Sequence, residues 1–286
     1  MTNDPSRMET FGRDGLTFEV TDVGPLDGRI VIALHGFPED RQSWSALAGS
    51  LTSAGYRVLA PDQRGYSPLA SPRHRRAYTA SNLRADILAL ADAAGAERFD
   101  VVGHDWGGFV AWDLAARNAD RVRSCTSLST PHPLAIRDVA LKSTQMLHLW
   151  YVLAFQFPVL PELSLRMLGA SGGAKMLERG GLDAANAAEY AARFARPGGM
   201  TGPINWYRGL PASLRDPVPD VTAVPTLFVW GDGDDYLKRA AAVATAHHVT
   251  APYRFEVLTG APHWLPTSSP ERIAPLLLEH LASAPA

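Results

Sequence analysis

Two patterns of hydrophobic and polar positions take turns along much of the chain: short apolar runs and longer stretches with helical spacing. Short continuous apolar runs, such as the one at 29–34, are typical of strands buried on both faces of a parallel sheet. Between them lie longer stretches with helical spacing, one of them opened by a capping residue, Ser81. Residues 16–23 alternate apolar and polar, as an edge strand does. The pattern predicts strands at 16–23, 29–34, 56–60, 99–102, 122–128, 226–230 and 253–258, and helices at 41–54, 81–94, 106–118, 236–248 and 271–282.

This alternation stops near residue 130 and resumes near residue 220. The intervening stretch is rich in Ala, Leu and aromatic residues, is interrupted by Pro and Gly, and shows no buried-strand pattern. Regular strand–helix alternation predicts a parallel sheet with right-handed crossovers. We therefore expect an α/β fold in which residues 1–130 and 220–286 form the core domain and 131–219 form an inserted all-helical cap.

Composition and net charge exclude several classes of function for this protein. The 286 residues are 46% hydrophobic and 20% charged, which is ordinary for a globular protein, and the net charge of −2 argues against a nucleic-acid surface. The single cysteine, Cys125, excludes an intramolecular disulfide and fits a reducing compartment, so we expect a cytoplasmic protein. The polar residues 1–10 show no secretory signal, and the longest apolar stretch, 146–160, is too short and interrupted to span a bilayer.

The stretch Gly103-His104-Asp105-Trp106-Gly107 lies where a predicted buried strand gives way to a helix. It matches G-x-D-x-G, the nucleophile elbow of an α/β-hydrolase with Asp in place of Ser. Glycines flank such a strained turn because Cβ atoms do not fit beside the nucleophile. The turn would hold the Asp105 carboxylate at a helix N-terminus, which favours negative charge. On these residues alone, a Gly-rich turn without chemistry is an equally good interpretation.

Two further loops at strand ends carry residues that a nucleophilic reaction needs. Asp234 follows the first strand after the cap, and His263 follows the last strand. The chain order Asp105, Asp234, His263 is the order of nucleophile, carboxylate and base in α/β-hydrolases, and functional groups in open α/β sheets gather at such loops. We expect Asp232 and Asp235 to be solvated or capping residues.

The loop after the strand at 29–34 is the expected oxyanion hole. Its donors would be the backbone N–H groups of Phe37 and of Trp106, the residue after the nucleophile. We expect His35 to be a structural hydrogen-bonding residue in this loop. The segment 169–173 also matches G-x-S-x-G, but no strand precedes it, so we interpret it as a helix C-terminus and loop.

An Asp nucleophile changes the reaction that the elbow supports. A carboxylate attacks an sp³ carbon and forms an alkyl ester, which a water activated by His263 then hydrolyses. A halide leaves without a proton, whereas an epoxide oxygen needs an acid such as the phenol of Tyr. Tyr151 and Tyr207 lie in aromatic stretches of the predicted cap, although periodicity alone is more typical of core aromatics there.

With these motifs together, the chain resembles the α/β-hydrolase-fold epoxide hydrolases from about residue 11 to residue 281. The resemblance implies that Asp105 is the nucleophile, that His263 is the base oriented by Asp234, and that Tyr151 and Tyr207 bind the epoxide oxygen. It implies no metal or organic cofactor, and a small hydrophobic epoxide and water as partners. We expect the substrate to contact Phe37, Trp106, Trp150 and Phe155. The motifs are His35-Gly36-Phe37-Pro38, Asp62-Gln63-Arg64-Gly65-Tyr66-Ser67, Gly103-His104-Asp105-Trp106-Gly107-Gly108, Tyr151 with Phe155-Gln156, Asn205-Trp206-Tyr207-Arg208, Trp230-Gly231 with Asp234, and His263-Trp264.

Two alternatives and two departures from the family pattern stay open. A haloalkane or haloacid dehalogenase can use the same fold and an Asp nucleophile, and the Trp106 indole could bind halide. Such an enzyme usually has Asn after His35-Gly36 and a halide-binding pair in place of the two tyrosines. A non-catalytic ligand-binding relative would lack Asp, His or acid, all of which are present. Pro262 and the residues 265–267 depart from the family pattern around the histidine. The sequence leaves the oligomeric state open, a homodimer included.

Overall fold

The computed structural model describes residues 7–213, 215 and 218–285. Its centre is an eight-stranded sheet in the order β1-β2-β4-β3-β5-β6-β7-β8. β1 pairs antiparallel with β2 and β2 with β4, whereas every other pair is parallel. This is the mostly parallel sheet that the strand–helix alternation predicts. The strands are β1 (Thr10–Arg13), β2 (Leu16–Val23), β3 (Ile30–Leu34), β4 (Arg57–Pro61), β5 (Phe99–His104), β6 (Val122–Leu128), β7 (Thr226–Gly231) and β8 (Tyr253–Leu258).

The sequence predicted seven of these strands and missed β1. The missed strand pairs with β2, so the predicted edge strand at 16–23 is not at the edge of the sheet. The turn between them consists of Asp14 and Gly15, which both have positive φ. Asp-Gly is a strong signal for a two-residue hairpin turn, and it was available in the sequence.

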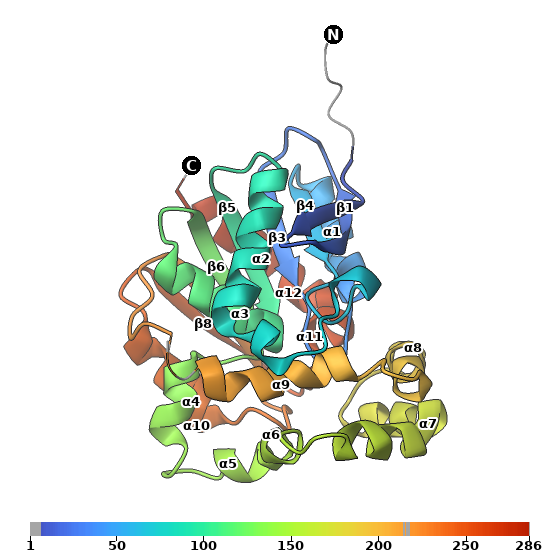
Figure 1. Ribbon diagram of the computed structural model, residues 1–286. Coiled ribbons are helices and arrows are strands. Elements are labelled where there is room, and N and C mark those ends of the chain that lie inside the picture. The colour runs from blue at the N-terminus through green and yellow to red at the C-terminus, as the bar shows by residue number, and fades with distance from the viewer. Residues whose placement is uncertain (1–6, 214, 216–217, 286) are drawn as a thin grey trace.

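Helices cover both faces of the sheet (Figure 1). Adjacent residues of a strand point to opposite faces, so Ile32 and Val101 join one buried cluster while Val31 and Val102 join the other. The first cluster includes side chains of α2 and α3, and the second includes those of α1 and α12. The helices of this domain are η1 (Arg41–Trp44), α1 (Ser45–Ser53), η2 (Pro68–Ala70), η3 (Arg75–Tyr78), α2 (Ala80–Ala93), α3 (Trp106–Arg117), α10 (Arg239–Ala244), η4 (Thr245–His248), α11 (Leu265–Ser268) and α12 (Pro270–Ser283).

Two helix boundaries differ from the sequence prediction. Ser81 does not cap α2, because Thr79 occupies the N-cap position and Ser81 lies within the first turn. The helix predicted from residue 236 begins at Arg239 instead. Before it, the Asp234 carboxylate accepts hydrogen bonds from the backbone N–H groups of Tyr236 and Leu237, and the N-cap residue Lys238 has an extended backbone, with φ −97° and ψ 157°.

The described part of 131–219 is helical, as predicted, and lies below the sheet in Figure 1. Gly169 has a φ of 67° and divides α7 into two helical pieces. The G-x-S-x-G match at 169–173 therefore begins where the first helical piece ends, as predicted, but a second helical piece follows directly in place of the predicted loop. No helix of the described residues has the length and apolar character needed to cross a membrane. The helices are α4 (Pro133–Val139), α5 (Gln145–His148), α6 (Trp150–Ala154), α7 (Leu160–Arg179), α8 (Ala184–Ala195) and α9 (Thr201–Ser213).

Candidate active site

Asp105 occupies the turn between β5 and α3, with φ 49° and ψ −117°. A non-glycine residue rarely adopts positive φ, so the turn is strained. The neighbouring glycines make it sterically feasible: a Cβ on Gly107 would lie 2.0 Å from the Leu34 carbonyl oxygen, and one on Gly103 would lie 2.2 Å from the Gly107 carbonyl oxygen. The sharp strand-to-helix corner is therefore built as the G-x-D-x-G pattern predicts.

The loop after β3 binds the Asp105 carboxylate directly. The backbone N–H of Phe37 donates to Asp105 Oδ1 at 2.8 Å. The buried Glu39 carboxylate holds this loop, because its Oε2 accepts from the Gly36 N–H at 3.0 Å and lies 2.7 Å from His104 Nδ1. His104 thus points away from the cavity, as expected for the residue before the nucleophile. His35 is likewise structural: its Nε2 accepts a hydrogen bond from the Gln63 N–H.

His263 lies between the two predicted carboxylates. Its Nδ1 is 2.7 Å from Asp234 Oδ2, and its Nε2 is 3.6 Å from Asp105 Oδ2. The Asp234 side chain is fully buried, and its other oxygen accepts the two backbone hydrogen bonds of the following loop. The three side chains that the strand-end loops predict are therefore brought together in the predicted order.

The electrostatics favour an ion pair in the resting site. Burial by itself lowers the pKa of His263, but the negative charges of Asp234 and Asp105 outweigh it and raise the pKa to about 10. Burial also disfavours the charged form of Asp105, but the hydrogen bond and charge of His263, together with His104 and the Phe37 N–H, outweigh it and lower the pKa of that carboxyl. At neutral pH the site consequently holds a carboxylate beside an imidazolium.

Tyr151 of α6 and Tyr207 of α9 face the same space from the cap. Their ring centroids are 5.9 Å apart, and the Tyr207 ring lies 5.3 Å from that of Phe37. Burial is the main cause that raises the pKa of both phenols well above the ordinary value, and the nearby charge of Asp105 adds to it in each case. Both hydroxyls therefore stay protonated and can act as hydrogen-bond donors.

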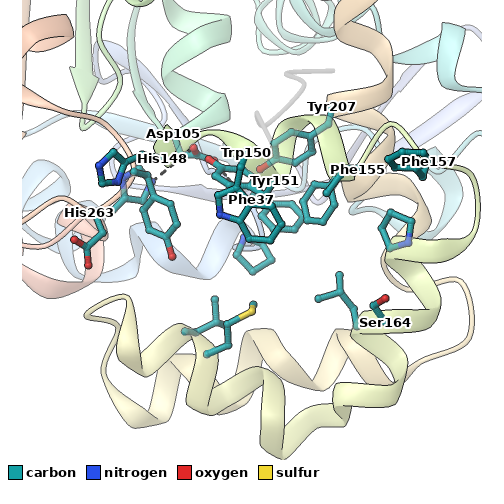
Figure 2. A pocket seen from close by; sticks show the side chains of 18 of the residues that line it. Phe37, Asp105, His148, Trp150, Tyr151, Phe155, Phe157, Ser164, Tyr207 and His263 are labelled. Atoms are coloured by element: carbon teal, nitrogen blue, oxygen red, sulfur yellow. Dashed lines mark hydrogen bonds and ion pairs between the residues drawn. The ribbon is translucent and has the colours of Figure 1, made fainter. Parts of the chain in front are cut away.

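A cavity of about 640 Å³ joins these groups. Figure 2 shows Asp105, Tyr151 and Tyr207 together on one side of it, with Ser164 across from them. Such a volume is ordinary for a small-molecule site. Of the predicted site residues, those that line the cavity are Phe37, Asp105, Trp150, Tyr151, Phe155, Tyr207 and His263.

Comparison with known proteins identifies the family. Residues 29–270 match the family model for the alpha/beta hydrolase fold. The chain is 34% identical to Epoxide hydrolase A of Mycobacterium tuberculosis, over 94% of this chain and 95% of that protein. The chain belongs to the α/β-hydrolase-fold epoxide hydrolase family. It is also 34% identical to the AB hydrolase superfamily protein YfhM of Bacillus subtilis, over 97% of this chain and 99% of the relative. The crystal structure of Epoxide Hydrolase A from Mycobacterium thermoresistibile superposes with a TM-score of 0.82 at 27% identity, over 98% and 99% of the two chains.

Two predicted residues of this epoxide hydrolase family member do not line the cavity. Asp234 lies buried behind His263. The Trp106 indole packs edge-on against the rings of Trp206 and Tyr207, with centroids 5.6 and 4.9 Å away. Contact between Trp106 and the substrate therefore gains no support from the cavity lining and stays a prediction.

The sequence missed several residues around this family site. Tyr236 lines the cavity, and its ring lies 5.0 Å from that of His263. The sequence did hold one indication that Tyr236 is near the site, namely that it follows Asp234 by two residues. Helix α7, which lies within the cap insertion, contributes an apolar wall that no motif marks. The lining residues that the sequence did not predict are Pro38, Leu147, His148, Ala154, Phe157, Leu160, Pro161, Ser164, Leu165, Met176, Leu177, Asp235, Tyr236 and Trp264.

The secondary predictions on acidic residues are largely confirmed. Asp232 is exposed and accepts a hydrogen bond from the Gly260 N–H, and Asp235 is exposed as well, although it reaches the cavity rim.

Among the described residues, no group of three or more His, Cys, Asp or Glu side chains has the arrangement of a metal site. Cys125 is buried in β6, as predicted.

Proposed function

We propose that the protein is an epoxide hydrolase that converts a small hydrophobic epoxide and water into a vicinal diol. One observation carries the proposal: a carboxylate at a nucleophile elbow shares a cavity with two protonated phenols and a histidine paired with a second carboxylate. The phenols supply the acid that an epoxide oxygen needs on leaving, and the carboxylate supplies the nucleophile.

In the first step, Asp105 Oδ2 attacks one ring carbon and the carbon–oxygen bond of the ring breaks. The oxygen leaves with the electron pair and takes a proton from Tyr151 or Tyr207. The Phe37 N–H stays bonded to Asp105 Oδ1 and orients the carboxylate for attack. The product is an alkyl ester on Asp105, and the phenolate regains a proton that the imidazolium of His263 releases.

The release of that proton follows from the charges. Esterification removes the negative charge of Asp105, which is one of the contributions that raise the pKa of His263. The neutral imidazole then takes a proton from a water that attacks the ester carbonyl, and Asp234 stabilises the imidazolium. The Phe37 N–H is placed to bind the developing oxyanion, and we assign the second donor to the Trp106 N–H. Collapse expels the diol alkoxide, the new carboxylic acid of Asp105 supplies its proton, and the initial ion pair is restored.

The proposal is tested by trapping the ester. The substitution His263→Gln removes the base of the second step and leaves the nucleophile and phenols in place. Incubation with styrene oxide should give an intact mass equal to protein plus substrate, located by peptide mapping on Asp105. The change His148→Gln, at another histidine that lines the cavity, should leave no such adduct.

Two outcomes would contradict the proposal. If the His263→Gln variant forms no adduct with styrene-type, aliphatic or long-chain epoxides, the covalent mechanism is wrong. If the wild type instead releases chloride from haloalkanes and forms no diol from any epoxide, the protein is a dehalogenase on this fold.

A further inference from the structure

The cap carries most of the exposed large hydrophobic side chains that the structure describes. Of fifteen such residues, twelve belong to the segment 141–176. This segment contains α5, α6 and most of α7, which lie along one edge of the molecule in Figure 1. An apolar surface of this extent is unusual for a protein that contacts only water. We call it the cap face; its residues are Leu141, Met146, Leu147, Trp150, Leu153, Phe157, Val159, Leu160, Leu163, Met167, Leu168 and Met176.

The exposed positions follow helical spacing. Leu160, Leu163 and Met167 of α7 recur at intervals of three and four, so they form one outward stripe on that helix. Met167 is 87% exposed, and Leu141, in the turn before α5, is 97% exposed. The stripe is therefore an apolar helix face that the rest of the described chain leaves uncovered.

The cavity opens on this face. Five residues, namely Leu147, Trp150, Phe157, Leu160 and Met176, both line the cavity and belong to the cap face. An apolar substrate that enters the cavity must therefore pass these side chains.

The segment 141–176 carries a net positive charge. Its charged residues are Lys142, Arg166, Lys175 and Glu162, so the segment carries +2 in a chain whose net charge is −2. Glu162 is neutralised by an ion pair with Arg208 at 2.5 Å. The three cations are exposed, and within the described residues none of them has a carboxylate partner.

We propose that the cap face docks on an anionic lipid surface. Tryptophan and leucine side chains partition into the boundary between headgroups and acyl chains, and each lysine or arginine near an anionic membrane adds about 1 kcal/mol of attraction. The surface would also concentrate the substrate, because a hydrophobic epoxide dissolves in lipid and the cavity mouth faces it. This delivery of substrate rests on the proposed function, whereas the docking itself does not.

A second copy of the chain is a less suitable occupant. A copy bound here would cover the five mouth residues and close the route into the cavity. A two-fold contact would also bring the cations of one copy against those of the other. A lipid surface avoids both conflicts, since it has the opposite charge and contains the apolar compound that the cavity takes.

The test is co-sedimentation with vesicles made of equal parts of phosphatidylglycerol and phosphatidylcholine. The full-length protein should bind them, and the double change Leu153→Gln with Met167→Gln should weaken binding about tenfold or more, since both apolar side chains are lost from the contact. Neither residue lines the cavity, so turnover of a water-soluble epoxide should stay unchanged. The matched control changes Leu69 and Val243, two exposed apolar residues outside the cap, to Gln and should bind like the wild type.

Tryptophan fluorescence supplies a second measurement. Trp150 is 67% exposed and is the one exposed residue among the seven tryptophans. Brominated lipid in the same vesicles should quench its emission in the wild type, and the quenching should disappear in Trp150→Phe. Co-sedimentation and quenching can both be measured on an Asp105→Asn variant, which needs no catalysis. The two experiments therefore test membrane docking separately from the proposed reaction.

Three results would overturn the proposal. The first is a wild-type protein that stays in the supernatant with these vesicles. The second is equal binding to vesicles of phosphatidylcholine alone, which would remove the role of the three cations. The third is a stable dimer in light scattering that the Leu153→Gln, Met167→Gln variant converts to monomer, which would make the cap face an interface between copies.

Discussion

In the mechanism that we propose, the residue type at position 105 decides the chemistry of the site. Serine at a nucleophile elbow attacks a carbonyl carbon, whereas the carboxylate of Asp105 can attack an sp³ carbon and become the acyl part of its own ester. The surrounding residues suit that change. The Phe37 N–H already binds one carboxylate oxygen, and His263 lies beside the other.

Also at the residue scale, the phenols of Tyr151 and Tyr207 should partly replace each other as the acid that protonates the epoxide oxygen. Single changes Tyr151→Phe and Tyr207→Phe should each slow alkylation about tenfold, and the double change should slow it 10²- to 10⁴-fold, roughly the range of general acid catalysis. The rate is measured as formation of the alkyl-enzyme in single turnover, in the His263→Gln background. Tyr190→Phe removes another buried cap hydroxyl, outside the cavity, and should leave the rate unchanged. An alkylation rate unaffected by the double change would refute the acid role.

The sequence predicted the residues whose positions depend on strand ends. Asp105, Asp234 and His263 each follow a buried strand, and the carboxyl ends of parallel strands meet at one edge of a sheet. The positions of strand ends do not predict how Trp106 packs. Its ring contacts those of Trp206 and Tyr207, which belong to a helix about a hundred residues further along the chain. Local sequence patterns do not indicate which aromatic rings pack against each other across the fold.

At the scale of elements, one cap helix holds the loop that binds the nucleophile. Arg193 of α8 donates to the carbonyl oxygens of Pro38 and Glu39 at 3.1 and 3.0 Å and to Asp40 Oδ2 at 3.1 Å. Its guanidinium also lies 4.9 Å from the centre of the Tyr66 ring. These contacts fix the backbone on the C-terminal side of Phe37, whose N–H binds Asp105.

Loss of this contact should therefore slow hydrolysis of the ester more than its formation. In Arg193→Met the Phe37 N–H is less well placed for the oxyanion, and we expect the alkyl-enzyme fraction at steady state to rise severalfold, measured by rapid quench and intact mass. Arg193→Lys should restore part of the effect. Arg208→Met is the control, because Arg208 binds Glu162 and the Phe155 and Phe157 carbonyls but not the loop. An unchanged alkyl-enzyme fraction in Arg193→Met would refute this role.

Most elements of the core domain were predictable, and the exceptions have local causes. The strands β6 and β8 begin and end at the residues that the sequence predicts. The helix after β7 starts late because Lys238 before it has an extended backbone and donates its N–H to Gln145 Oε1 of α5, a tertiary contact that hydropathy does not register. In the cap, the helix end that the sequence predicts at 169–173 is a kink at Gly169, beyond which α7 continues.

At the scale of the whole molecule, the fit between cap and core depends on close backbone contact along α9. Gly202 and Gly209 are seven residues apart, so they lie on one face of that helix. A Cβ on Gly202 would lie 2.3 Å from the Gly65 carbonyl oxygen, and one on Gly209 would lie 2.2 Å from that of Tyr78. Tyr207 is carried by the same helix, so its place in the cavity follows from this contact.

The change Gly209→Ala should therefore affect both stability and chemistry. The added methyl group meets backbone and not a movable side chain, so α9 must shift away from the core and take Tyr207 with it. We expect a lower melting temperature and a loss of about tenfold or more in kcat/KM, because a misplacement of about 1 Å near a reacting group is costly. Gly49→Ala, at an exposed position of α1 with open space at its Cβ, should instead raise stability by about 0.5–1 kcal/mol and leave kcat/KM unchanged. A Gly209→Ala protein that loses stability but keeps full activity would show that Tyr207 is positioned by the cap alone, independently of how the cap rests on the core.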